Sequence, residues 1–203
     1  MVDFTAEQVD RAIKMLNHLP GEAQKAMANA MNRAIDGAHT AAARKIAARY
    51  RIKPARAKEG IGKARHANPA DLHAGFDSIG RRPTLYQYGP SPSQPGTGGA
   101  GRPSLRVAVL RSHGKKKLRH AFALGGKANA DGARNMLVGW RIRGTQMKSN
   151  HKKEKIQGLY GPAIPQMLGQ ESVLQAVEKV ARERLDARLD HEIERALERA
   201  GRR

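Results

Sequence analysis

Hydrophobic residues near the start of the chain recur at helical spacing. A short first helix is expected because Val9, Ile13 and Leu16 lie three or four residues apart. Thr5 and Gln8 just before them fit a capping box. After the break at residues 19–21, a long second helix is expected from about Glu22 to Tyr50. Its apolar stripe consists of Met27, Met31, Ile35, Ala38, Ala42 and Ile46. The many alanines favour close packing against another helix, of this chain or of a second subunit, although an ordinary core helix gives the same pattern.

The end of the chain repeats an apolar residue at every fourth position. We therefore expect a last helix from about Gln170 to Ala200. The residues of this stripe are Val173, Val177, Ala181, Leu185, Leu189, Ile193 and Leu197, widened by Leu174 and Val180. A coiled coil is one alternative, but a four-residue spacing drifts away from a heptad seam. We expect this helix to pack on the sheet of its own domain.

Between the helices the apolar positions alternate with polar ones, as is typical of half-buried strands. The alternation is seen at residues 105–109, 118–124 and 136–143, and more weakly at 71–79 and 83–88. One face of these strands would be apolar, including Met136, Val138, Trp140 and Ile142. The other face would carry Arg106, Arg119, Arg141 and Arg143. The pattern predicts an α+β fold in which an antiparallel sheet of about four strands is flanked by the long N-terminal and C-terminal helices.

We interpret the whole chain, residues 1–203, as one domain. It would consist of N-terminal helices (1–50), a basic sheet region (51–158), an uncharged apolar segment (159–168) and the C-terminal helix (169–203). Residues 89–103 are nearly all Gly, Pro and Ser, which indicates a long loop. Residues 143–155 are polar and indicate a second loop.

Positive charge is concentrated in the middle of the chain. The net charge is +20, and residues 102–155 alone hold fifteen basic and two acidic side chains, for +13. Such a field implies an acidic partner, either phosphate backbones or an acidic protein. The candidate contact residues are Arg106, Arg111, Lys115, Lys116, Lys117, Arg119, Arg141 and Arg143, with further basic residues at 51–65. Candidate aromatic platforms are few (Tyr86, Tyr88 and Trp140), which favours backbone contact without base readout.

The sequence offers little for catalysis. Asp131 and Glu154 are the only carboxylates of the basic segment, so paired-carboxylate chemistry is not expected there. The histidines do not form a metal-binding motif, and the chain has no cysteine. We expect no catalytic residue, metal or cofactor, and no membrane-spanning segment.

The segment LYGPAIPQML, from Leu159 to Leu168, is the most distinctive stretch of the chain. Together with the helix end ARYRIKPARAKEGI at 48–61, the intervening sheet region and the charged last helix, it resembles the minor tail protein Z family of long-tailed bacteriophages and prophages. The resemblance covers most of the chain in order and spacing. It is weakest at 89–103, which is interpreted as an insertion.

The resemblance implies a structural role in tail completion at the head-proximal end of the tail, and in head–tail joining. The protein would form a ring, with six subunits as the expected number, around the channel that the genome crosses. Its partners would be further copies of itself, the tail terminator or tail tube protein, the head–tail connector protein and double-stranded viral DNA. It would be assembled in the host cytoplasm and reside in the virion.

We call residues 159–168 the apolar elbow. Pro162 and Pro165 should make it stiff and extended, since each fixes a backbone angle and removes an amide donor. It would offer an apolar strip consisting of Leu159, Tyr160, Ile164, Met167 and Leu168. The strip is expected to dock the last helix on the sheet, with a subunit contact as the alternative.

Two other functions remain open at this point. The chain could be a free, basic nucleic-acid-binding protein that contacts phosphate backbones without base readout. It could also be a nuclease, against which the lack of clustered carboxylates argues.

Overall fold

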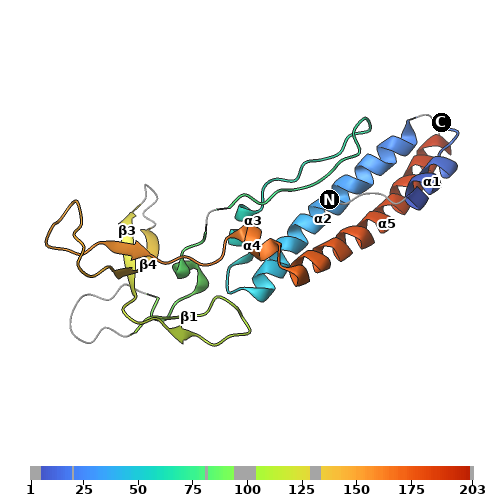
Figure 1. Ribbon diagram of the computed structural model, residues 1–203. Helices are drawn as coiled ribbons and strands as arrows, with labels where there is room; N and C mark the ends of the chain where they lie inside the picture. The colour runs from blue at the N-terminus through green and yellow to red at the C-terminus, as the bar shows by residue number, and fades with distance from the viewer. Residues whose placement is uncertain (1–5, 20, 81, 94–103, 129–133, 202–203) are drawn as a thin grey trace.

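The protein is elongated, with its helices gathered at one end and its strands at the other (Figure 1). The computed structural model describes residues 6–19, 21–80, 82–93, 104–128 and 134–201. Two long helices form the helical half, and two short helices lie where the halves meet. The fold is α+β, as the sequence predicts.

The helical half is built on an antiparallel pair, α2 (Glu22–Arg49) and α5 (Glu171–Gly201). Their direction follows from two contacts: Arg49 donates to Ser172 Oγ at 2.9 Å at one end, and Asn29 donates to Glu192 at 3.4 Å near the other. The predicted stripe of α2 is buried throughout. The predicted stripe of α5 is buried from Val173 to Ile193. The prediction that α5 packs on a sheet is wrong, because its apolar stripe lies along α2 instead.

Three apolar residues of the predicted stripes are exposed rather than buried: Ile13, Leu174 and Leu197. Ile13 lies on α1 (Ala6–Met15), which meets α5 through other residues. Gln8 donates to Asp186, and Arg11 Nη1 lies 2.9 Å from Asp190 Oδ1. These contacts rotate α1 so that its buried side chains recur four residues apart, at positions 8, 12 and 16. The predicted capping residue Thr5 is outside the described residues.

An extended hairpin at residues 61–80 lies along α2, after the short helix α3 (Pro54–Gly60). Arg65 and Gly75 exchange backbone hydrogen bonds of 2.7 and 3.1 Å. The Asn32 side chain on α2 makes two hydrogen bonds with the hairpin. Its Nδ2 donates to Ala67 O at 2.9 Å, and its Oδ1 accepts from Ala67 N at 2.7 Å. The weak strand at 71–79 is thus a stretch of hairpin with isolated bridges. The one expected at 83–88 is wrong, because residues Leu85–Tyr88 form a 3-10 helix, η1.

The strands form two small antiparallel sheets where one of about four strands was predicted. Strands β1 (Arg106–Val107) and β2 (Lys116–Lys117) pair with each other, and β4 (Arg134–Arg141) lies between β3 (Phe122–Ala128) and β5 (Ile156–Gly158). The predicted strand at 118–124 begins only at Phe122, because His120 adopts a left-handed backbone with φ 61° and turns the chain. That turn separates the sheets.

The apolar elbow joins the sheets to the helices. Its first part is extended: Leu159 N donates to Val138 O at 2.7 Å, and Gly161 N donates to Pro83 O at 2.8 Å. Its second part is helical, which corrects the prediction of an extended strut. Helix α4 (Ile164–Leu168) has Pro165 in its first turn, where a missing amide costs nothing, and the Gln166 side chain accepts from Ala163 N at 3.0 Å.

The elbow contributes to the core of this chain through Ile164 and Met167, which are 3% and 0% exposed. Helix α4 contacts α2, α3 and α5. Leu159, Pro162, Pro165 and Leu168 are half-buried, whereas Tyr160 is exposed. Ile164 and Met167 therefore pack inside this chain, but the prediction that the elbow docks the last helix on the sheet is wrong, because α4 packs against helices.

Candidate nucleic-acid interface

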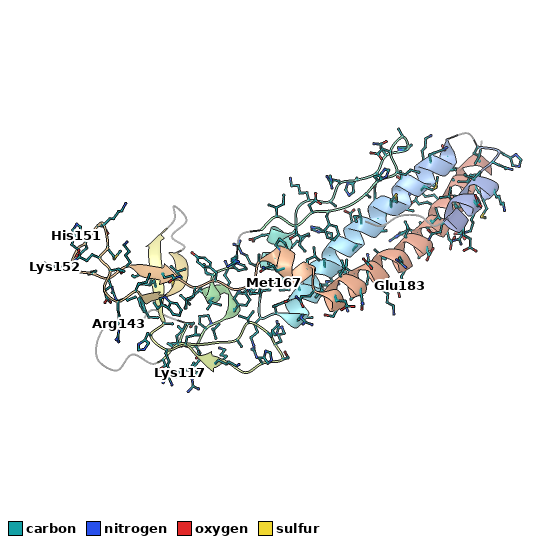
Figure 2. All side chains as sticks on the ribbon, in the orientation of Figure 1. Lys117, Arg143, His151, Lys152, Met167 and Glu183 are labelled. Carbon is teal, nitrogen blue, oxygen red and sulfur yellow. The ribbon has the colours of Figure 1, made fainter. Side chains whose placement is uncertain are left out.

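The described part of the basic segment lies at the strand-bearing end of the molecule and adjoins the C-terminus of α2. Every Lys and Arg side chain described between residues 104 and 125 and between 136 and 155 is exposed. Lys117, Arg143 and Lys152 mark this end in Figure 2, while Glu183 marks the helical half. The loop predicted at 143–155 is present as the connection between β4 and β5. Of the loop predicted at 89–103, residues 94–103 lie outside the described residues.

These positive charges lack acidic partners within the part of the chain that the structure describes. No ion pair there involves a side chain between residues 104 and 155. The other half of the molecule is different, with pairs such as Arg11–Asp190, Arg65–Asp77 and Lys179–Glu183. The charges of the basic end are therefore open to an anionic ligand.

The first group of predicted residues lies on the β1–β2 hairpin. Arg106 is paired with Lys117 and Val107 with Lys116 in the register of the two strands, and Lys115 immediately precedes β2. All four basic side chains are exposed. Like charges directly opposite each other destabilise a strand pair. An anion bound over Arg106 and Lys117 would relieve that repulsion.

Arg111 belongs to a different environment from the other candidates. Its Nε donates to Ala47 O at 2.7 Å, and its backbone N donates to Arg49 O at 2.9 Å. Both acceptors are carbonyls at the C-terminus of α2, where a cation is favoured by the helix dipole. Arg111 therefore caps a helix in this structure.

The remaining predicted residues, Arg119, Arg141 and Arg143, converge on one hollow. The hollow has a volume of about 780 Å³ and is lined by Arg119, His120, Phe122, Trp140, Arg141, Ile142, Arg143, Glu154 and Gln157. Arg119 comes from the turn before β3, Arg141 is the last residue of β4, and Arg143 lies in the turn that follows. The prediction that Arg106 shares a face with these three is wrong, since Arg106 belongs to the other sheet.

The side chains of the hollow are held in place by specific contacts. The Arg141 guanidinium lies 5.7 Å from the centre of the Phe122 ring, within the range of a cation–π interaction. Arg141 also donates to Glu154 O at 3.4 Å. Trp140 Nε1 donates to Gln157 Oε1 at 3.1 Å, and the Trp140 side chain is 39% exposed. The apolar face predicted for β4 is thus buried at Val138 and exposed at Trp140 and Ile142.

Of the predicted aromatic platforms, only Trp140 lies at the basic end with its ring in a hollow. Tyr88 is buried, and its hydroxyl donates to Pro162 O at 3.3 Å. Burial and the neighbouring Tyr50 raise the pKa of Tyr88 above its ordinary value. Tyr86 donates to Ser93 O at 3.0 Å, away from the hollow. Sequence reasoning missed Phe122, whose place in the alternating stretch 118–124 suggested only a core residue.

Comparison with protein-family models, with curated proteins and with solved structures found no match for this chain. In the described residues, no group of three or more His, Asp or Glu side chains is arranged to hold a metal ion. No described helix is long and apolar enough to cross a membrane. The exposed Lys and Arg side chains and the exposed Trp140 ring of the basic end are suited to holding an anion in place.

Proposed function

We propose that this protein is a structural component of the tail of a long-tailed bacteriophage or prophage. It would act in tail completion and head–tail joining at the head-proximal end, with its basic end directed at DNA. The proposal assigns it no catalytic activity. Its partners would be other copies of itself in a ring, the tail terminator or tail tube protein, the head–tail connector protein and the double-stranded DNA that passes through.

One observation carries the part of this proposal that concerns DNA: charge is segregated along an elongated molecule. The basic segment forms one end with its Lys and Arg side chains exposed, and the helical pair forms the other (Figure 2). A ring of such molecules could direct the basic ends at a channel and the helical ends at the surrounding wall. Six or more phosphate contacts per assembly would make the interaction strongly dependent on salt.

The tail assignment itself is supported by the sequence resemblance at the elbow. In the structure this segment contributes Ile164 and Met167 to the core, so its apolar character serves the fold of the single chain. Among the apolar residues of the segment Tyr160 is the exposed one, with 53% of its surface accessible. It is the elbow residue best placed for a contact with a neighbouring subunit.

Charge reversal on the hairpin tests the proposal. Replacing Lys115, Lys116 and Lys117 with glutamate should leave the fold intact, because all three are exposed, and should reduce the yield of joined particles or their DNA content. A matched control reverses three exposed lysines of the helical half, Lys14, Lys45 and Lys63, by the same total charge. Normal particle titres for the hairpin variant would contradict the proposed role of this end.

The second candidate is a free nucleic-acid-binding protein that contacts phosphate backbones. It is favoured by the finding that the alanine-rich stripe of α2 is covered by α5 of the same chain, so this stripe requires no second subunit. Gel filtration of tails and of free protein separates the two candidates. Co-migration with tails supports the first, and a salt-sensitive complex with DNA without tail incorporation supports the second.

A further inference from the structure

The hollow at the end of the three-stranded sheet differs from the rest of the basic surface because it combines cations with a ring. The β1–β2 hairpin presents the exposed cations Arg106, Lys115, Lys116 and Lys117. The hollow presents three arginines, an exposed indole and the Phe122 ring. Contact with the phosphates of a duplex requires cations such as those of the hairpin. It makes no use of an exposed aromatic ring.

We propose that this hollow binds single-stranded nucleic acid, with one base stacked on Trp140 and the adjacent phosphates on Arg119, Arg141 and Arg143. The inference rests on the proposed function only in that the partner is a nucleic acid. It goes beyond passage of a duplex, because it assigns a place where an unpaired base is held.

The indole of Trp140 is presented in a fixed orientation. Its Nε1 is anchored on Gln157 Oε1, and Gln157 is the residue that pairs with it across β4 and β5. Stacking on a ring that is already oriented costs less conformational entropy than ordering a free side chain. The ring therefore suits a flat, neutral partner such as a base.

The arginines supply the complementary charge next to this ring. Arg141 is oriented by the Phe122 ring and by the carbonyl of Glu154, and both contacts leave part of its guanidinium fork available. A guanidinium fork matches two phosphate oxygens at once. Among the described residues that line the hollow, Glu154 is the one carboxylate, and it does not offset the three cations.

The dimensions favour one nucleotide unit and its flanking phosphates. A volume of about 780 Å³ falls within the range of about 300–1,000 Å³ that is typical of small-ligand sites. In an intact duplex the base faces are stacked on one another, so the indole could be reached only by a base that has left the stack. A single strand presents its bases freely, and no sequence preference is expected, because every base has a face that can stack.

The experiment uses Trp140 as its own probe, since it is the only tryptophan of the chain. The intact protein is titrated with a mixed-sequence DNA oligonucleotide and, separately, with the duplex of the same length at the same salt concentration. Stacking should quench the Trp140 fluorescence with the single strand and leave it nearly unchanged with the duplex.

Two variants isolate the ring in a second titration, which follows a fluorophore on the oligonucleotide. Trp140→Ala should weaken single-strand binding about 10-fold and duplex binding less than about 2-fold, whereas Trp140→Phe should retain most of the affinity. Leu197→Ala removes an equally exposed apolar side chain from the helical half, 40% exposed, and should change neither. Unchanged circular dichroism confirms that each variant is folded.

The outcomes separate this inference from the proposed function. Two results would overturn the inference and leave the phosphate contact standing. One is that Trp140→Ala weakens single-strand and duplex binding equally. The other is that the protein binds duplex but its fluorescence does not change with the single strand. Single-strand quenching in a protein that never enters tails supports the inference and contradicts the tail assignment. No binding of either DNA contradicts both, and an acidic protein then becomes the partner.

Discussion

At the scale of single residues, the junction between the two halves depends on close approaches that leave no room for side chains. A Cβ atom placed on Gly60 would lie 2.8 Å from Ile164 Cβ, closer than real Cβ contacts allow. A Cβ atom placed on Gly161 would lie 2.5 Å from atoms of the Tyr88 ring. Neither glycine has a positive φ, so space and not backbone strain is what requires glycine there.

Gly60→Ala should therefore destabilise the protein by about 1–3 kcal/mol, the usual cost of overpacking. Ile164 is 3% exposed and cannot swing into solvent without opening the core. Urea unfolding of Gly60→Ala and of Gly114→Ala provides the comparison, because a Cβ on Gly114 meets nothing within 4 Å. Equal midpoints for the two variants would show that the packing around Gly60 is looser than described.

Tyr88 should make the free energy of unfolding fall as the pH rises in the alkaline range. Its folded-state pKa is raised above the ordinary value of 10.0 by burial, so the folded state keeps a proton that the unfolded chain loses. The contribution is complete below pH 10.0 and is lost as the pH rises above that value. The loss should approach about 1.4 kcal/mol per pH unit for this one group.

The check is urea unfolding of the wild type and of Tyr88→Phe between about pH 8 and pH 11, a range that spans the ordinary tyrosine pKa. Tyr88→Phe lacks the ionisable hydroxyl and the hydrogen bond that it donates to Pro162 O. The variant should therefore be less stable than the wild type at about pH 8 but lose less stability as the pH rises. If the free energy of unfolding fell equally with pH in both proteins, Tyr88 would not be the source of the pH dependence.

At the scale of elements, the molecule depends on the antiparallel pair of α2 and α5. Leu189 is 0% exposed in this interface, while Leu197, two turns further along the same helix, is 40% exposed. The two leucines belong to one sequence stripe but have different environments. The difference arises because a four-residue repeat drifts around a helix of about 3.6 residues per turn, so that Ala196, 3% exposed, is buried in place of Leu197.

Leu189→Ala should cost about 2–5 kcal/mol of unfolding free energy, the range for a fully buried leucine. Leu197→Ala should stay within about 0.5 kcal/mol of the wild type, as for most surface substitutions. Thermal or urea unfolding of the two variants measures the difference directly. Similar losses at both positions would mean that Leu197 is covered in solution, for instance by a second copy of the chain.

The elbow gives a prediction on local stability. Pro162→Ala with Pro165→Ala frees two backbone angles in the unfolded chain and should destabilise the segment by about 0.4–1 kcal/mol per site. Because α4 contacts α2, α3 and α5, amide exchange should quicken in α4 and in the first turns of α5. Unchanged exchange there, or faster exchange confined to the sheets, would argue against this role of the elbow.

The helices were predictable from sequence because their periodicity is long and regular. The predicted bounds of 22–50 and 170–200 compare with Glu22–Arg49 and Glu171–Gly201. The alanines of α2 predicted close packing against another helix, and α5 provides it. The stripe of α5 did not indicate this partner, since a four-residue stripe can pack on a helix as well as on a sheet. The strands were harder: the turn at His120 depends on a backbone angle that the alternation of residues does not encode. The alternation predicted that Arg119, Arg141 and Arg143 lie together. It did not predict that Arg106 lies apart from them, because that separation depends on the turn at His120.

At the scale of the whole molecule, the separation of an uncompensated basic end from an ion-paired helical end is the feature that the proposed function uses. Ion pairs such as Arg11–Asp190 and Lys179–Glu183 neutralise the helical half locally. The Lys and Arg side chains at the other end have no such partners among the described residues. Binding through that end should weaken steeply with salt, whereas the stability of the fold should change little.

The most direct test of the proposed function is a cryo-EM reconstruction of phage tails that carry this protein tagged at its C-terminus. We expect a ring at the head-proximal end of the tail, with the tag beside the helical pair and Lys115, Lys116 and Lys117 facing the channel. Tails that lack the protein, or a ring in which these lysines face outward, would contradict it.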